Sequence, residues 1–433
     1  MVWAVPAILK AMPDRYVARL PEPLQKIGLP EDREAILPTV ASPVQAQDLL
    51  LPEISEDKEI SSGQDMMMTP EVTIAAQTIE MPAEENGDLQ PTLQNMPTVV
   101  PIPTPTPWPI PASARLNGFQ HKFQDWNNCG PATLAMALTF FGMNVTQADT
   151  ASILKPNPED RNVSPNEMAS YVIEQTPFQA ISRANGTRGT LRRLVANDIP
   201  VIIEIGIEPP GEYRWMGWYG HYLLVVAYDD NEEQFWVYDS WFGTSEEPLQ
   251  NAHPDGRTLS YEDLDTYWPH FNRNYIVLNQ PEQADKVALI VGEEMDEHIM
   301  WENALVAAQK EVAGQLDNAF LWFNLGTAYN ALEQYDAAAT AFDQARAIGL
   351  PWRMLWYQFG PYEAYYKSGR YDDVALLADV TLKDRPYFEE SYYYKGLALA
   401  AKGDLKGAQE NLKLAVDFNP NYSPAAEALA GLK

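Results

Sequence analysis

Cys129 is the only cysteine in the 433 residues, and it lies in the stretch Gln124-Asp-Trp-Asn-Asn-Cys129-Gly-Pro-Ala. The apolar run that follows predicts a helix over Cys129–Met143, with Pro131 in the first turn, where the missing N–H of proline costs no hydrogen bond. A thiol there meets the positive end of the helix dipole, which favours the nucleophilic thiolate. The pattern suits covalent catalysis; an inert buried cysteine is the alternative.

A thiol nucleophile needs a base within hydrogen-bond reach and a third group that orients the base. His221 begins an apolar strand, and the polar break at 229–233 predicts a hairpin to a returning strand that ends at Asp239. With the turn in this break, His221 faces position 240 or 241, and Asp239 lies within one pair or a diagonal of it. The hairpin therefore brings an imidazole and a carboxylate to one end of a sheet.

Gln124 is a candidate for stabilising the charge that develops during acyl transfer. Its side-chain amide can donate to an oxyanion, with the backbone N–H of Cys129 as second donor; an ordinary loop residue is the alternative. His121 either lines the site or is an ordinary surface or packing residue. The other histidines are weaker candidates: His253 falls in a loop, His270 at the entry to an aromatic strand, and His298 outside the domain.

The elements that must position these residues predict an α+β domain over residues 113–281. The aromatic stretch Arg214–Gly220 before His221 either walls a substrate groove or packs in the interior. Besides the helix at Cys129, we expect a helix from the capping box Ser164-Pro-Asn-Glu167 to about Glu174, a helix over Gly189–Asn197, and strands over Pro200–Ile207, Tyr222–Tyr228, Gln234–Tyr238 and Tyr275–Leu278.

From about residue 285 the pattern becomes helical and repeats. One copy of a tetratricopeptide-like motif comprises Trp322, Leu325, Gly326, Tyr329, Ala338, Phe342, Ala345 and Pro351. A further copy contains Gly396, and a degenerate copy over 356–374 fits between the two. Solenoids need about three stacked units. We therefore predict an all-α solenoid over 285–433, closed by a capping helix at 423–433, that recruits a protein substrate or partner.

Residues 1–112 have the composition of an acidic, Pro-rich and largely disordered tail and linker. About half of the 35 prolines lie there; the segment ends in a polyproline spacer at 100–111, and a short helix is plausible near Pro6–Leu20. The apolar start, Met1–Leu9, is either a short anchor or the remnant of a membrane segment. An extracytoplasmic, membrane-tethered protein and a cytoplasmic one both remain open.

Charge and cysteine content exclude several classes of protein. The formal net charge of −30 argues against nucleic-acid binding, which requires clustered Lys and Arg, and is typical of a soluble acidic surface. One cysteine excludes an internal disulfide framework and a Cys-based zinc site. The sequence predicts no cofactor and no metal.

The order Gln…Cys-Gly-Pro-Ala…Gly-His-Tyr…Tyr-Asp-Ser over about residues 116–280 resembles the papain-like cysteine peptidases of the C39 type, the leader peptidases and their stand-alone relatives. The resemblance implies Cys129 as nucleophile, His221 as general base and acid, Asp239 as orienter and Gln124 as oxyanion donor. Gln124 is slightly closer to Cys129 than is usual, so Gln120 remains an alternative donor. The chain has no phosphate-binding loop of the kind that the fused export transporters carry.

We therefore expect a cysteine peptidase that hydrolyses peptide bonds through a Cys-His-Asp triad. Two alternatives remain: an amide acyl-transferase that uses the same residues, and a non-catalytic peptide-binding scaffold built from a peptidase-like domain and repeats.

Overall fold

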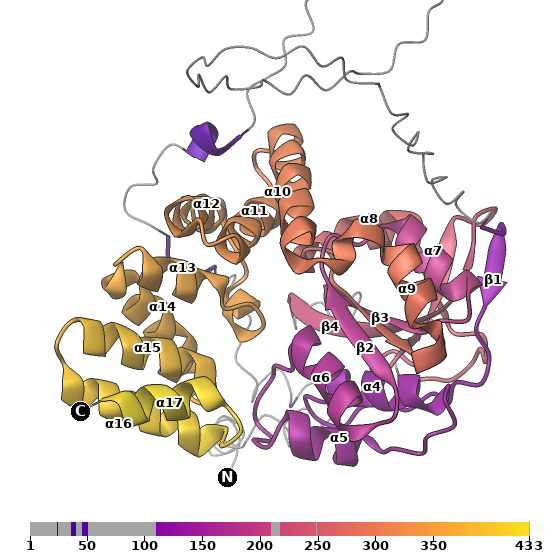
Figure 1. The fold of residues 1–433 in the computed structure, drawn as a ribbon, viewed down its shortest axis with the longest axis horizontal. Helices are drawn as coiled ribbons and strands as arrows, with labels where there is room; N and C mark the ends of the chain where they lie inside the picture. Colours follow the sequence, from indigo (N-terminus) through magenta and orange to yellow (C-terminus); the bar gives the residue numbers. More distant parts are fainter. Residues whose placement is uncertain are drawn as a thin grey trace, which may run out of the picture. The chain divides into compact units, whose positions relative to one another are not determined.

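The computed structural model describes residues 24, 36–39, 46–50, 110–208, 217–247 and 249–432. Residues 110–432 all belong to one compact unit, which contains the sheet and the helices described below (Figure 1). The helix expected near Pro6–Leu20 and the spacer up to residue 109 lie outside the described residues. Within the described part of the chain, no helix is long and apolar enough to cross a membrane.

The described strands form one antiparallel sheet. Its order is β2-β7-β3-β4-β5-β6, with β1 paired to β4. β3 follows Pro200 and is buried over its first six residues, as expected of a strand that is covered on both faces. The strands are β1 (Ser113–Arg115), β2 (Gln179–Arg183), β3 (Val201–Ile207), β4 (Tyr219–Asp229), β5 (Gln234–Asp239), β6 (Arg257–Ser260) and β7 (Tyr275–Asn279).

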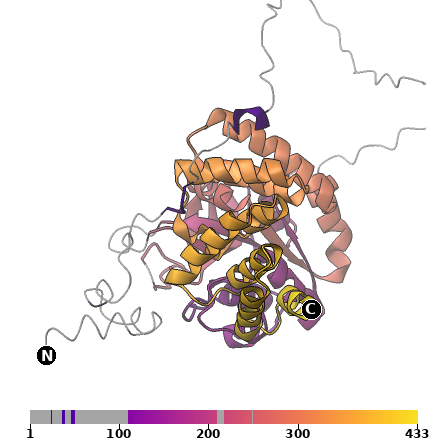
Figure 2. The same ribbon diagram turned by 90° about the vertical axis from the view of Figure 1, so that its left-hand side faces the viewer.

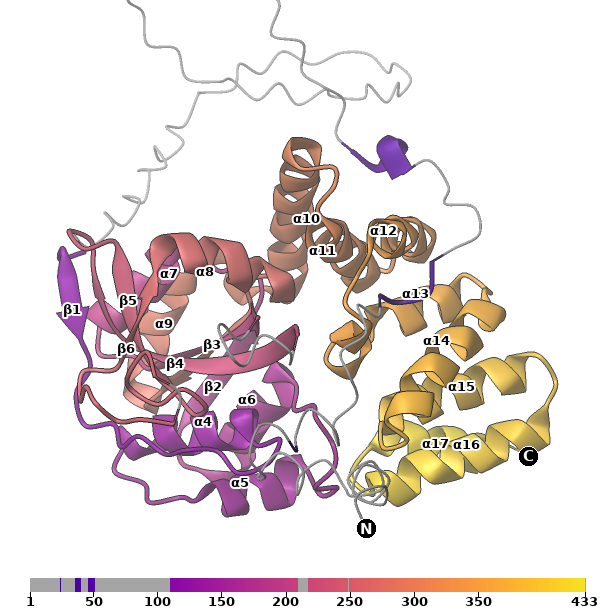
Figure 3. The same cartoon turned by 180° about the vertical axis from the view of Figure 1, so that it is seen from behind.

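Two groups of helices cover the two faces of this sheet (Figures 1 and 3). Because neighbouring strand residues point to opposite faces, β3 directs Ile202 into one apolar cluster and Ile203 into the other. The cluster with Ile202 contains residues of α4 (Cys129–Thr139), α5 (Gln147–Leu154) and α6 (Pro165–Gln175). The cluster with Ile203 contains residues of α7 (Arg188–Ala196), α8 (Tyr261–Tyr267) and α9 (Ala284–Val291).

Local sequence explains where several of these helices begin and end. α6 starts at the predicted capping box, in which Ser164 and Glu167 each accept the other's backbone N–H. α5, which the sequence analysis does not predict, starts with the same device at Thr146 and Asp149. α4 ends at Thr139 rather than at the expected Met143, because the chain turns away at Gly142, where φ is 78°.

Beyond α9 the chain is helical, as predicted, and consecutive helices pack as neighbours (Figure 2). A Cβ added to Gly326 would lie 2.6 Å from the Phe342 ring, and one added to Gly396 would lie 2.7 Å from Leu412. Small residues therefore let paired helices approach closely; the tetratricopeptide assignment itself stays a prediction. The helices are α10 (Glu297–Gly314), α11 (Ala319–Ala331), α12 (Tyr335–Ile348), η6 (Trp352–Trp356), α13 (Gly360–Lys367), α14 (Tyr371–Asp384), α15 (Glu389–Ala401), α16 (Leu405–Phe418) and α17 (Ser423–Gly431).

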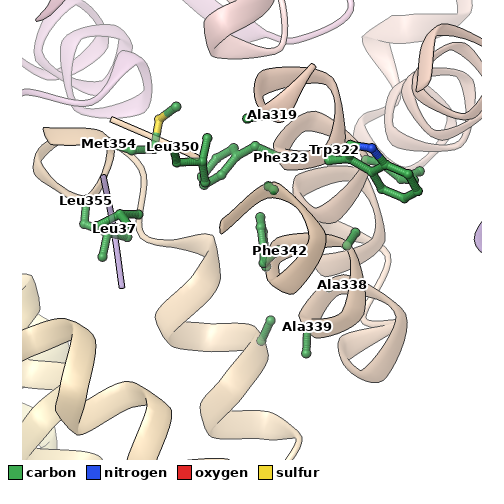
Figure 4. Packing of buried hydrophobic residues seen from close by; sticks show 14 of the residues in the cluster. Leu37, Ala319, Trp322, Phe323, Ala338, Ala339, Phe342, Leu350, Met354 and Leu355 are labelled. Carbon is green, nitrogen blue, oxygen red and sulfur yellow. The ribbon is translucent and has the colours of Figure 1, made fainter. Parts of the chain in front are cut away.

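Two short pieces of the N-terminal region belong to the core of the helical region. Leu37 is fully buried in the same apolar cluster as Leu350 and Leu355 (Figure 4), and its N–H donates to the carbonyl of Leu350 at 3.0 Å. The hydroxyl of Tyr329 donates to the carbonyl of Leu49 at 3.0 Å. Residues 36–39 and 46–50 thus differ from the disorder expected for residues 1–112, because apolar side chains in both pieces are buried in this core.

Candidate active site

His221 and Asp239 lie on the two strands of one hairpin. In the register of β4 and β5, Leu223 faces Asp239, and a bulge between Val225 and Ala227 precedes the turn. His221 is two residues before Leu223 and is therefore diagonal to Asp239. Nε2 of His221 lies 2.7 Å from Oδ1 of Asp239. The hairpin thus brings the imidazole and the carboxylate together as predicted.

The carboxylate of Asp239 is fully buried and strongly hydrogen-bonded. Oδ1 also accepts the backbone N–H groups of Trp241 at 2.7 Å and Phe242 at 3.0 Å. Oδ2 accepts two hydrogen bonds from the Arg257 guanidinium, at 2.9 and 3.0 Å. Burial alone raises the pKa of this carboxyl, but the charges of His221 and Arg257 outweigh it and hold the pKa below its usual range. Asp239 is therefore a fixed negative charge beside His221.

His221 joins Asp239 to Cys129. Burial opposes the charged imidazolium, but the charge and hydrogen bond of Asp239, together with the hydrogen bond and charge of Cys129, raise the pKa of His221 to about 10. Cys129 is the first residue of α4 and a free, partly exposed thiol. Because Asp239 occupies Nε2, Nδ1 is the ring nitrogen that remains for the thiol. His221 is thus placed to hold the proton of Cys129.

Gln124 lies beside this pair through Ser240, the residue after Asp239. Its backbone N–H donates to the carbonyl of Ser240, and its Oε1 accepts from Oγ of Ser240, both at 2.8 Å. With Oε1 engaged, the side-chain NH2 is the part of Gln124 that remains for an oxyanion. Gln120 is exposed, and its N–H is bonded to Thr139 Oγ1 at 2.9 Å. The structure therefore places Gln124 next to the His–Asp pair, and its role stays a prediction.

The remaining histidines have other surroundings. His121 supports Asp239, because its Nε2 lies 2.7 Å from the carbonyl oxygen of Asp239 and its ring packs against Phe123. His270 lies in the turn η3 (Trp268–Phe271) and not at a strand entry, since Pro269 near the start of the turn favours helical geometry. Burial lowers the pKa of His270 to about 3. His253 and His298 are exposed.

A pocket opens beside Cys129. Gly220 and Tyr222, the residues directly before and after His221 in the sequence, both line this pocket. Of the wall residues, only Cys129 is recognisable from the sequence as a candidate site residue. Among the described residues, no group of three or more His, Cys, Asp or Glu side chains is arranged to hold a metal ion. The pocket is lined by Asn127, Cys129, Gly130, Pro131, Arg161, Asn162, Val163, Glu204, Gly220, Tyr222 and Tyr357.

Glu204 places a buried carboxyl in this wall. It faces Tyr222 across β3 and β4, and its Oε2 accepts from Nδ2 of Asn274 at 2.8 Å. Burial raises the pKa of Glu204 to about 8, against the lowering effect of its hydrogen bonds to Asn274 and Tyr222 and of the charge of His221. The one hydroxyl hydrogen of Tyr222 is donated to the carbonyl of Val163 at 2.7 Å. Because burial outweighs these contacts, Glu204 favours its neutral form near pH 7.

Comparison with known proteins finds similarity over the sheet region. Residues 115–272 match the model of the Peptidase_C39 like family, which supports a cysteine-peptidase-like domain there. A crystal structure of a protein assigned as a C39-like peptidase from Bacillus anthracis is similar at 15% identity and a TM-score of 0.30, over 38% of this chain and 96% of that chain. No curated protein sequence matches this chain. The helices beyond α9 lie outside the family match.

Proposed function

We propose that the protein is a cysteine peptidase that hydrolyses peptide bonds through Cys129, His221 and Asp239. The observation that carries the proposal is the position of His221, whose Nε2 lies 2.7 Å from the buried carboxylate of Asp239 and whose pKa is raised in part by Cys129 at the start of α4. The family match over residues 115–272 supports a peptidase-like domain around these three side chains.

The chemistry proceeds through a thioester. His221 takes the proton of Cys129, and the sulfur attacks the carbonyl carbon of the scissile bond. The side-chain amide of Gln124 and the backbone N–H of Cys129 donate to the resulting oxyanion. His221 then protonates the leaving amine as the C–N bond breaks. Water, activated by His221, hydrolyses the thioester and restores the thiol. An amine in place of water would give acyl transfer with the same residues.

Alkylation by iodoacetamide tests the first requirement of this mechanism. We expect Cys129 to react faster than free cysteine at pH 7, and His221→Ala to bring the rate back to that of free cysteine. Cys129→Ala should show neither labelling nor turnover. If the wild-type thiol reacts no faster than free cysteine, the enzyme proposal fails and a peptide-binding scaffold takes its place. A peptide library, with and without an added amine, then separates hydrolysis from acyl transfer.

The paired helices α10–α17 support a second part of the proposal, recruitment of a protein substrate or partner. Recruitment requires that deleting residues 301–433 lower the turnover of a protein substrate more than that of a short peptide. Equal losses for the two substrates would contradict it.

A further inference from the structure

One residue of the helical region lies in the wall of the Cys129 pocket. Tyr357 follows η6 and precedes α13, whereas all other lining residues lie between positions 127 and 222. The side chain is half-buried. Tyr357 and Cys129 line the same pocket. The pocket therefore has a wall that the sheet region alone does not supply.

The strand that carries His221 leaves space for the ring of Tyr357 at Gly220. A Cβ added to Gly220 would lie 2.6 Å from Cζ of Phe271 and 3.1 Å from Cδ1 of Tyr357. The Tyr357 ring packs edge-on against Trp218 and Phe271, with centroids 5.8 and 5.9 Å apart. Since Gly220 immediately precedes His221, its missing side chain lets Tyr357 approach the base of the candidate triad.

Side-chain hydrogen bonds join the helical region around Tyr357 to the sheet region. Gln358 Nε2 donates to the carbonyl of His270 at 2.9 Å, and Arg353 Nη1 donates to the carbonyl of Trp218 at 3.1 Å. Asn324 Nδ2 donates to the carbonyl of Pro269 at 2.6 Å. Residues on both sides of Tyr357 are therefore fixed, which limits how far its ring can move.

A second wall residue contacts the helical region. The guanidinium carbon of Arg161 lies 5.0 Å from the ring centroid of Trp126 and 5.0 Å from that of Trp356. Trp126 precedes Cys129 in the sequence, and Trp356 is the residue before Tyr357. The wall that contains Arg161 and the wall that contains Tyr357 thus depend on the same turn of the helical region.

Tyr357 is suited to a steric role. Burial raises the pKa of its phenol above the usual value, and the charge of Cys129 raises it further, so the side chain stays neutral at any pH at which a peptidase works. A neutral aromatic ring of low mobility restricts the shape of a pocket without taking part in proton transfer.

We propose that Tyr357 is a specificity-determining residue, which forms the outer wall of the substrate pocket beside Cys129 and limits the size of the peptide side chain that the pocket accepts. This inference rests on the proposed function, because it assumes that a peptide enters this pocket. It makes the helical region part of the substrate pocket in addition to any role in recruitment.

The test uses dipeptidyl chloromethyl ketones, in which each of the two side chains is alanine, leucine or phenylalanine in turn, with iodoacetamide as a small reference probe. In the wild-type chain we expect bulky side chains at one position to slow alkylation of Cys129 at least tenfold relative to alanine. Tyr357→Ala should reduce this discrimination at least tenfold. Tyr357→Phe should retain it, because the ring remains.

Tyr366→Ala is the matched control, since Tyr366 is a partly buried tyrosine of the same helical cluster outside the pocket wall. Tyr357→Leu replaces Tyr357→Ala if circular dichroism or thermal melting shows that the alanine variant is unfolded. Unchanged discrimination at both positions in a folded Tyr357 variant overturns the inference. Slow iodoacetamide labelling of the wild type would instead contradict the peptidase proposal, and the ratio of rates among the ketones would still report on the wall.

Discussion

Arg257 binds the oxygen of Asp239 that His221 leaves free. The guanidinium donates to Oδ2 at 2.9 and 3.0 Å, while Nε2 of His221 lies 2.7 Å from Oδ1. Asp239, at the end of β5, is therefore held between two cationic partners, one on each of the strands that flank β5, namely β4 and β6. The carboxylate that contacts the imidazole is consequently fixed by several hydrogen bonds of its own.

Asp239→Asn should weaken both catalysis and stability. Loss of the charge that raises the pKa of His221 to about 10 should move the alkaline limb of turnover to lower pH. Loss of orientation should reduce kcat by about 10³- to 10⁴-fold. Leaving Arg257 without its buried partner should cost about 3–5 kcal/mol of the free energy of unfolding. Activity profiles and urea denaturation measure these effects, and an unchanged alkaline limb would contradict the assigned electrostatics.

Arg257→Met should have a smaller effect on turnover, of about tenfold, since the contact between His221 and Asp239 remains. Without the guanidinium the pKa of Asp239 rises toward its ordinary value. The stability that ionised Asp239 contributes is present above that ordinary value and is lost as the pH falls, so the variant should unfold at a higher pH during acid titration. Arg192→Met removes a different ion pair, with Asp230, and serves as the control.

Gln124→Ala should reduce kcat by about 100-fold, because one oxyanion donor contributes about 3 kcal/mol. Alkylation of Cys129 by iodoacetamide forms no oxyanion, so its rate should stay the same. Gln120→Ala, at an exposed position, should change neither quantity. A fall in kcat for Gln120→Ala but not for Gln124→Ala would reverse the assignment of the donor.

Glu204→Gln should flatten the pH dependence of stability. The pKa of Glu204 is raised from 4.5 to about 8, so the folded state keeps a proton that the unfolded chain loses. This stabilisation is fully present below pH 4.5 and is lost at about 1.4 kcal/mol per pH unit as the pH rises toward 8. Glutamine mimics the neutral carboxyl and should remove that slope. The free energy of unfolding is measured by urea denaturation at several pH values between 4.5 and 8. The same pH dependence in the two proteins would show that Glu204 is ionised in the folded state.

Gly220→Ala should destabilise the fold by about 1–3 kcal/mol, because the added methyl meets Phe271 at 2.6 Å. It should also displace Tyr357 and thereby alter the relative rates of small and bulky alkylating peptides. Gly314→Ala is the control, since a Cβ at this position has no neighbour within 4 Å. Equal stability of the two variants would show that a methyl group fits at position 220 without displacing its neighbours.

The position of Asp239 beside His221 was predictable because both residues belong to one hairpin. A polar break of known length fixes the register of two adjacent strands, and the bulge at Val225–Ala227 shifts it only slightly. The start of α6 was also predictable from local sequence, since its capping box involves residues three apart. Predictions of this kind need no knowledge of how distant segments pack.

Arg257, Glu204 and Tyr357 could not be found in the same way. Arg257 reaches Asp239 because β6 pairs with β5, and β6 is too short and too polar to predict. Glu204 looks like one charge in an apolar strand until the packing shows it buried in the pocket wall. Tyr357 lies in the irregular turn between η6 and α13. Each depends on tertiary contacts between segments that are far apart in the sequence.

The place of Tyr357 also bears on how such chains could be recombined. A chimera with residues 110–281 grafted onto a foreign helical array would keep Cys129, His221 and Asp239 but would lack one side of the pocket. Under the proposed function, its reaction would be preserved and its choice of peptides altered. For the proposed peptidase, exchanging helical arrays would therefore change the choice of peptides while Cys129, His221 and Asp239 stay the same.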